Sequence, residues 1–414
     1  MRIALTNPTC WPEVRRGSER HLHDHARYHA AAGHEVTVIS THAAPREDRT
    51  EDGVRHILLP RRLPLGRPNR WLGAFHAFAL QVRDEVRAAA AQGRGFDVVH
   101  CLNYHDAFGV LLAGPSRPRL VYHMAGIPLR AYFRRIPHDG WMFRHVLRHA
   151  ESCAVVSRHA KQMLRDQFGV DGMLLPAPCD LAPLYATPKP PPDGRLHLLF
   201  AADADEPRKG ALLLARAFSQ VRAARPDATL TFAGPANPAT REAVLAAAAE
   251  ADRAQIIFAG VGAPGDLAAR YAASSLLVHP AVWEAQGMVL VEALAAGTPV
   301  VACDHGGVTD IVNDPAIGRL FGPGAIRGHA ATDHTALARA ILEAAALAAD
   351  PATAQRCRLH AAPFGWDRLG PLYEAVLAGA APARSPDSDG GPARAHAPCG
   401  MGSNDLHNPH RPDA

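Results

Sequence analysis

Residues 276–303 constrain this chain more than any other stretch. The run 276–278, Leu-Leu-Val, is short and apolar, which indicates a strand buried on both faces of a parallel sheet. Apolar residues at helical spacing follow Gly287, and Gly297 with the Thr-Pro pair after it ends that pattern. The segment 300–302 is a second apolar run. The stretch therefore predicts a strand, a loop, a helix and another strand of an α/β fold.

Two glutamates lie at one end of this predicted unit. Glu284 lies in the loop before the helix, and Glu292 lies just over one turn inside it. The helix begins with the N–H groups of Gly287, Met288 and Val289, which lack partners within the helix and favour an anion such as a diphosphate. Carboxylates on both sides of a diphosphate suit a nucleotide sugar, which carries hydroxyl groups at both ends. The alternative is that both glutamates are ordinary solvated residues.

The spacing Glu284-x7-Glu292, in the context EAQGMVLVEALAAGTPVVA, resembles the signature of the retaining glycosyltransferases of family 4. The resemblance implies that Glu284 contacts the donor sugar and that Glu292 holds the ribose hydroxyls. Arg208-Lys209-Gly210 is similar to the diphosphate-binding turn of the family, in which the lysine neutralises the phosphates. The implied fold is α/β, of the GT-B type. It has two Rossmann-like parallel-sheet domains facing across a cleft and a C-terminal helix crossing back to the N-terminal domain.

Bulk composition agrees with a globular protein of two domains. A chain of 414 residues is too long for one ordinary core, and a net charge of +4 is too small at this length to favour a nucleic-acid partner. The seven cysteines form no C-x-x-C pair and fall mostly in apolar runs, as buried reduced thiols do. We see no segment apolar and long enough for a signal peptide or a membrane helix. We therefore expect a soluble cytoplasmic protein, with at most peripheral contact with the inner face of a membrane.

The order of patterns, read together with the family resemblance, predicts five segments. They are an N-terminal Rossmann-like, acceptor-side domain (1–184), a proline-rich linker (185–194), a C-terminal Rossmann-like domain that binds the nucleotide sugar (195–362), a crossover helix that packs on the N-terminal domain (363–379) and a tail (380–414). The tail is rich in Pro, Gly, Ser and Asp without periodicity, so we expect it to be disordered.

The first domain contributes two further candidates. Segment 2–40 reads as a strand, a helix and a strand, similar to the opening of the family, where two consecutive glycines are usual. Arg16 replaces the first glycine, so close approach of the backbone to the donor rests on Gly17. His123 ends the strand predicted at 119–123, and the family resemblance places it against the donor sugar beside the reaction centre. Without that resemblance, a lone histidine at a strand end is an ordinary structural residue.

Two histidine- and arginine-rich segments allow more than one interpretation. His21, His25 and His29 share one helix face at a spacing compatible with a metal, but no carboxylate or cysteine is evidently placed to complete a site. We therefore expect no metal and no obligatory cofactor, and an ordinary interface-facing helix. Segment 127–149 interleaves arginines with aromatic residues, which suits an anionic acceptor or a lipid surface, or equally a solvated helix with a core stripe.

One position departs from the family pattern. Ala202-Asp203 stands where a Gly-Arg pair is usual, and a carboxylate there repels a diphosphate. Three consequences are open: Arg208 substitutes, the donor is held more weakly, or the enzyme is impaired.

The resemblance to family 4 implies a hexosyltransferase-type enzyme. It would transfer a sugar with retention from a UDP- or GDP-sugar to a hydroxyl acceptor: a glycan, a lipid-linked sugar or a small molecule, as in the synthesis of cell-envelope polysaccharide or glycolipid. Catalysis would rest on positioning and electrostatics. Two alternatives stay open, namely a catalytically silent nucleotide-sugar-binding partner subunit and a GT-B-like sugar-phosphate synthase or epimerase.

Overall fold

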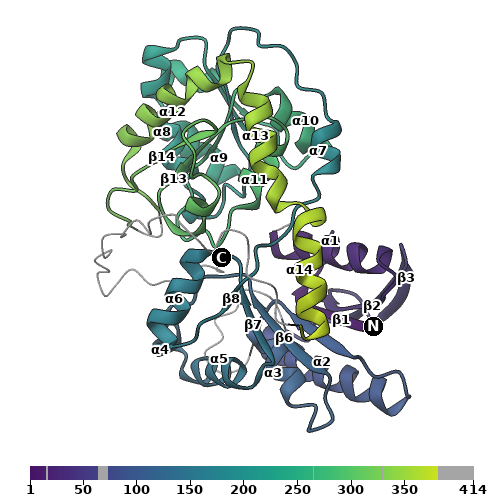
Figure 1. Ribbon diagram of the computed structural model, residues 1–414. Helices are drawn as coiled ribbons and strands as arrows, with labels where there is room; N and C mark the ends of the chain where they lie inside the picture. The colour runs from purple at the N-terminus through teal and green to yellow at the C-terminus, as the bar shows by residue number, and fades with distance from the viewer. Residues whose placement is uncertain (15–16, 64–72, 264, 328–329, 381–414) are drawn as a thin grey trace. The chain divides into compact units, whose positions relative to one another are not determined.

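The computed structural model describes residues 1–14, 17–63, 73–263, 265–327 and 330–380 (Figure 1). The chain divides into two compact units, each built around its own sheet. The first unit comprises residues 1–156, 161–178 and the described residues from 367 on, and the second comprises 157–160 and 179–366. Arg16 and the tail from 381 on, for which we predict disorder, lie outside the described residues.

The first unit is organised on an eight-stranded sheet in the order β3-β4-β2-β1-β5-β6-β7-β8. The strands are β1 (Arg2–Thr9), β2 (Glu35–His42), β3 (Glu47–Glu51), β4 (Val54–Pro60), β5 (Val98–Cys101), β6 (Arg119–Met124), β7 (Ser152–Val155) and β8 (Met173–Leu174). Neighbours pair in parallel except β3 and β4, which are antiparallel. The sequence EDRTE of β3 is exposed at every position, so it has no apolar pattern that would predict a strand. Its charges suit the edge of the sheet.

Helices connect these strands because parallel pairing requires a crossover. They are α1 (Gly17–Ala31), α2 (Ala74–Ala91), α3 (Tyr104–Leu111), α4 (Arg130–Arg135), α5 (Pro137–His149) and α6 (Arg158–Phe168). The last helix of the described chain, α14 (Trp366–Ala378), packs in this first unit, as the resemblance implied. None of the helices within the described residues has the length and apolar character needed to span a membrane.

The second unit has a six-stranded sheet, parallel at every pairing, in the order β11-β10-β9-β12-β13-β14. The strands are β9 (His197–Phe200), β10 (Thr229–Phe232), β11 (Ile256–Phe258), β12 (Leu276–His279), β13 (Val300–Cys303) and β14 (Gly318–Phe321). The α-helices are α7 (Ala182–Ala186), α8 (Ala211–Ala224), α9 (Pro238–Ala247), α10 (Asp266–Ala273), α11 (Met288–Ala295), α12 (His334–Ala349) and α13 (Thr353–Ala361). Four short 3₁₀ segments are η1 (Pro207–Lys209), η2 (Glu250–Gln255), η3 (Gly306–Asp310) and η4 (Ala362–Phe364). Together with the first unit, this confirms the predicted α/β class.

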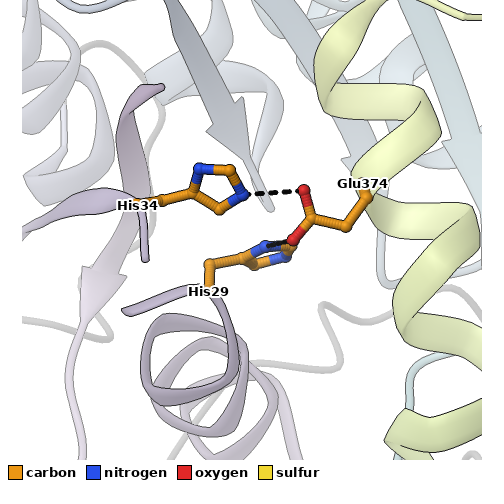
Figure 2. A group of neighbouring side chains, drawn as sticks. All are labelled: His29, His34 and Glu374. Carbon is orange, nitrogen blue, oxygen red and sulfur yellow. Dashed lines mark hydrogen bonds and ion pairs between the residues drawn. The ribbon is translucent and has the colours of Figure 1, made fainter. Parts of the chain in front are cut away.

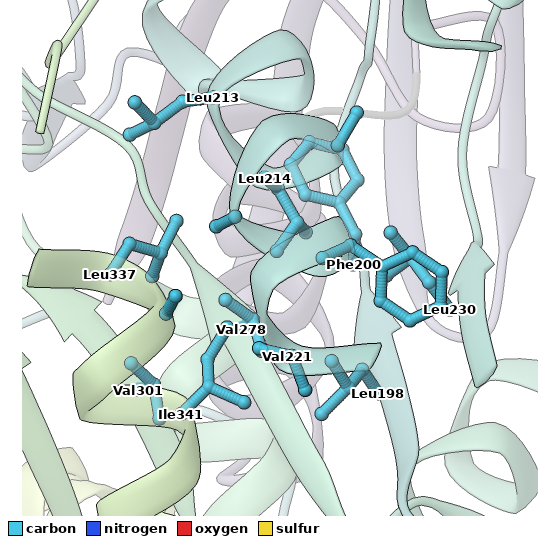
Figure 3. Packing of buried hydrophobic residues seen from close by; sticks show 14 of the residues in the cluster. Leu198, Phe200, Leu213, Leu214, Val221, Leu230, Val278, Val301, Leu337 and Ile341 are labelled. Carbon is cyan, nitrogen blue, oxygen red and sulfur yellow. The ribbon is translucent and has the colours of Figure 1, made fainter. Parts of the chain in front are cut away.

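Alternation along the strands of the second unit builds a core on each face of its sheet. Leu198 and Phe200 of β9 belong to the cluster beneath α8 and α12 (Figure 3), whereas Leu199 faces the cluster formed with α11 and α13. Both faces are buried, so the strands read as continuous apolar runs. Between the neighbours β9 and β12 the strand order reverses, and ligands of parallel sheets bind outside the carboxyl ends of strands at such a point.

Two leucines of α8 test this packing. Leu214 is 0% exposed in the cluster of Figure 3, and Leu212 on the same helix is 43% exposed. We expect Leu214→Ala to lower the free energy of unfolding of the second unit by about 2–5 kcal/mol, because it removes buried surface and leaves a cavity. Leu212→Ala should change it by no more than about 0.5 kcal/mol. Urea denaturation measures both, and equal effects of the two substitutions would contradict the assignment of this face.

Candidate active site

Two loops meet at the carboxyl edge of the second sheet. The chain leaves β9 and forms η1, which carries Arg208, and it leaves β12 into the loop 280–287. The backbone N–H of Val282 donates a hydrogen bond of 2.9 Å to the carbonyl of Arg208. Gly210 has a φ of +79°, and a Cβ there would lie 3.0 Å from the carbonyl oxygen of Pro280. The glycine of the Arg-Lys-Gly turn thus permits the close approach of the two loops.

The carboxylate of Glu284 is the centre of this edge. Its Oε2 lies 2.7 Å from Nζ of Lys209, 3.3 Å from Nη1 of Arg208 and 3.5 Å from Nε2 of His279. Only 17% of the Glu284 side chain is exposed. Burial alone raises the pKa of Glu284, but the charges of Lys209 and Arg208 and the hydrogen bond with His279 outweigh it and hold the pKa well below its usual value. The residues predicted to contact sugar and phosphate are therefore brought together, with Glu284 ionised.

Sequence reasoning missed His279, the residue that follows the apolar run 276–278. Its side chain is almost fully buried, and burial lowers its pKa, so the imidazole is neutral near pH 7. The available signal was its position, since a polar residue that ends a buried parallel strand points to the ligand-binding edge of the sheet.

The loop that carries Glu284 is held by the turn after β13. The N–H of Gly307 donates to the carbonyl of Glu284 at 2.8 Å, and a Cβ on Gly307 would lie 1.9 Å from the carbonyl oxygen of Ala285. Trp283 has a φ of +59°, unusual for a large side chain, and its N–H donates to Nδ1 of His305 at 3.1 Å. This strained conformation is maintained by its surroundings, as is common at functional sites.

Glu292 lies on α11, which starts beside this loop. Gly287 precedes the helix with a φ of +95°, so the first turn begins with the N–H groups of Met288 and Val289. The hydroxyl of Tyr271, which is 1% exposed, donates to Oε2 of Glu292 at 2.7 Å and orients the carboxylate. The expected order of loop glutamate, helix start and helix glutamate is thus present in the second unit.

Asp203 stands where the family usually has an arginine, but its carboxylate has a hydrogen-bond partner in its own turn. Its Oδ1 accepts a hydrogen bond of 3.0 Å from the N–H of Asp205, which ties the carboxylate to its own turn. Arg208 is directed towards Glu284 and also pairs with Glu206 at 2.8 Å. Its place beside Lys209 supports the hypothesis that Arg208 supplies the second positive charge.

Gly17 and His123 belong to the first unit, and their proposed roles towards the donor stay predictions. Gly17 is the exposed first residue of α1. His123 is fully buried on β6, stacks on His100 with ring centroids 5.3 Å apart and places Nε2 2.8 Å from the carbonyl oxygen of Leu175. Burial, opposed by that hydrogen bond, lowers the pKa of His123 to about 4.

Comparison with known proteins gives two matches that follow one another along the chain. Residues 15–181 match the family described as Glycosyltransferase Family 4, and residues 195–346 match Glycosyl transferases group 1. The chain belongs to the family 4 glycosyltransferases.

Curated relatives of the chain include two kinds of transferase. A D-inositol 3-phosphate glycosyltransferase of Arthrobacter sp. (strain FB24) is 34% identical over 189 residues, which is 44% of this chain and 42% of that protein. The chain thus matches less than half the length of this relative. A phosphatidyl-myo-inositol mannosyltransferase of Mycolicibacterium smegmatis is 27% identical over 77% of this chain and 80% of its own length.

Solved structures confirm the GT-B fold. A sucrose-phosphate synthase of Thermosynechococcus elongatus aligns with a TM-score of 0.73 at 22% identity, covering 91% of this chain and 99% of its own. Anabaena HepE in complex with UDP and glucose aligns with a TM-score of 0.66 at 18% identity, with the same coverage.

The buried imidazole of His123 predicts loss of stability in acid. Its folded pKa of about 4 lies below the unfolded value of about 6.5, so between these values the unfolded chain holds a proton that the folded one lacks. Stability should therefore fall as the pH falls through this window, by about 3 kcal/mol for this group. Urea midpoints between pH 7.5 and 4.5 should show a shallower dependence in His123→Gln than in the parent. The exposed control His149→Gln should keep the parental dependence, and identical slopes for all three proteins would refute the assignment.

Proposed function

We propose that the chain is a retaining glycosyltransferase that moves a hexose from a UDP- or GDP-sugar to a hydroxyl acceptor. The observation that carries the proposal is the arrangement in the second unit, where Glu284 and Glu292 flank the start of α11 and Lys209 and Arg208 lie at the first of them. The inositol-directed names of the curated relatives support an acceptor that contains a polyol, free or lipid-linked. A soluble cytoplasmic enzyme that acts in cell-envelope glycolipid synthesis is consistent with these relatives.

The donor would be held through its diphosphate. Lys209 has three N–H donors, of which Glu284 engages at least one, so the same ammonium group can also bind phosphate oxygens. Arg208 and the free N–H groups at the start of α11 add positive potential on the same edge. Glu284 would then accept hydrogen bonds from sugar hydroxyls, and Glu292, oriented by Tyr271, would accept them from the ribose.

Transfer would proceed mainly by positioning and charge stabilisation. The bond between the anomeric carbon and the diphosphate oxygen breaks, the acceptor oxygen bonds to the same face of that carbon, and the acceptor proton passes to the leaving diphosphate. Lys209 and Arg208 stabilise the negative charge that develops on the leaving group, which is the step where fixed charges contribute most. The chemistry needs no metal, because protein groups supply the positive charge.

Nucleotide binding tests the donor site. A nucleotide at about 100 times its Kd adds about 2.7 kcal/mol to the free energy of unfolding. We expect UDP or GDP to raise the Tm of the second unit, and Glu292→Ala to bind it about 10–100-fold more weakly because a charged hydrogen bond contributes about 1.5–3 kcal/mol. Tyr271→Phe, which keeps the carboxylate but loses its orienting hydroxyl, should cause a smaller loss. Glu343→Ala on α12, a side chain 56% exposed, is the matched control.

The outcomes separate the competing functions. Binding together with sugar transfer to an inositol-containing acceptor supports the proposal. Binding that depends on Glu292 without turnover on any acceptor supports the silent-partner alternative. Turnover with a sugar phosphate alone supports the synthase alternative. If no nucleotide changes the Tm of either protein, the donor-site proposal is wrong.

A further inference from the structure

A group of three side chains in the first unit is not used by the proposed transfer reaction. Figure 2 shows His29 from the last turn of α1, His34 from the turn before β2 and Glu374 from α14 pointing toward one another. Oε1 of Glu374 lies 2.6 Å from Nδ1 of His29, and Oε2 lies 2.8 Å from Nε2 of His34. The two imidazoles thus converge on one carboxylate from a segment about 340 residues earlier in the chain.

The donor set fits a transition metal ion. Two imidazole nitrogens and a carboxylate form a common set for Zn²⁺ and related ions, with the remaining positions open to water. The three ligand atoms lie within 4.8 Å of one another. Zn²⁺ bonds of about 2.0–2.2 Å at tetrahedral angles put ligand atoms about 3.3 Å apart, so the present contacts of 2.6 and 2.8 Å need to open by only about 0.5–0.7 Å.

One side chain of the group is fully buried and the other two are partly exposed, so the site is held in place and is still accessible to an ion from solvent. The side chain of His29 is 0% exposed and packs against His25, with ring centroids 4.5 Å apart, so its position is fixed. His34 and Glu374 are 18% and 28% exposed, which leaves a path from solvent for the ion and its water ligands.

A second histidine–carboxylate group in the first unit forms hydrogen bonds that leave no nitrogen of His76 available to a metal at the carboxylate. His76, His105 and Asp139 also lie close together, but all three are buried. The N–H of Gly73 donates to Nδ1 of His76 at 3.2 Å, so the proton of this neutral ring lies on Nε2, which faces Asp139 at 2.8 Å. That nitrogen has no lone pair for a metal.

Tautomer exchange is open at the His29 group. His29 can move its proton to Nε2 and present a lone pair at Nδ1. In His34, Nδ1 lies 3.2 Å from the amino nitrogen of Met1, which as an ammonium group donates to it. For Nε2 to bind an ion, the ring proton must move to Nδ1 and the amino group must lose a proton or turn away. Unlike the backbone N–H that donates to His76, the amino group is not an obligatory donor, so both rings can coordinate once this contact is exchanged.

We propose that His29, His34 and Glu374 form a site for a divalent transition ion of the Zn²⁺ class, separate from the transfer site and structural or regulatory in role. Nδ1 of His29, Nε2 of His34 and the Glu374 carboxylate are the protein ligands, and water completes the shell. The ion would tie the C-terminal helix α14 to α1, because Glu374 is the ligand that α14 contributes. The sequence-based interpretation that no carboxylate is placed to join the histidines of α1 is wrong for His29, since Glu374 reaches it.

Metal binding by the full chain tests the proposal. Titration calorimetry with Zn²⁺ and the absorption spectrum of added Co²⁺ should report a specific site in the parent protein. His34→Gln and Glu374→Gln should each weaken it by more than about tenfold, because each removes one of three protein ligands. His149→Gln is the matched control: it removes half of the i, i+4 pair His145/His149, whose ring centroids lie 4.1 Å apart, and so tests for adventitious binding by a histidine pair outside the proposed site. It should leave the specific site unchanged.

Hydrogen exchange gives an independent test of whether the ion ties α14 to α1. Zn²⁺ should slow amide exchange in peptides of α14 in the parent and in His149→Gln, and should have no such effect in His34→Gln. The proposal is overturned if the parent shows no Zn²⁺ or Co²⁺ binding, or if His34→Gln and Glu374→Gln bind as the parent does. Loss of binding in His149→Gln alone would assign the ion to the surface pair and would also overturn it.

Discussion

A buried carboxylate needs compensating charge, and the second unit is arranged around that need at Glu284. Removing a charge from water costs several kcal/mol unless partners replace the lost hydration. Lys209 and Arg208 provide that replacement from the loop after β9, and the Val282 backbone bond to Arg208 joins the two loops. The same contacts that keep Glu284 ionised therefore place two cations at the carboxyl edge of the sheet, at the switch point where a diphosphate would bind.

The first unit depends on a different constraint, the packing of neutral imidazoles around Tyr373. His25 and His123 lie with ring centroids 5.0 and 5.8 Å from this tyrosine, whose hydroxyl donates to the carbonyl of Pro176 at 3.1 Å. Burial lowers the pKa of His25 well below its usual value, because the charged imidazole would lose its hydration there. Tyr373 lies on α14, so we expect protonation of this cluster to weaken the packing of the last helix as well. Glu374, the next residue of α14, is 28% exposed and pairs with His29 and His34.

Patterns within short stretches of sequence predicted single helices and strands, but not the contacts between distant residues. The segment 276–303 gave the right elements, β12, α11 and β13, because apolar period, glycine position and a Thr-Pro stop all lie within one short stretch. The strand β3 could not be predicted, since its exposed charged residues carry no apolar period. The pairing of Lys209 with Glu284 joins residues 75 apart, and that of Glu374 with His29 joins residues 345 apart. No local sequence pattern encodes such contacts. The family resemblance identified Lys209 and Glu284 as site residues, but it gave no indication that Glu374 pairs with His29.

Hydrogen exchange of the full chain with UDP and with GDP most directly tests the claim that Glu284, Glu292 and the Arg208-Lys209 turn form one donor site. The account predicts that one nucleotide slows exchange together in peptides that cover 207–210 and 284–292 of the second unit. Protection of only one of these segments, or protection of the β10–β11 edge instead, would contradict the account.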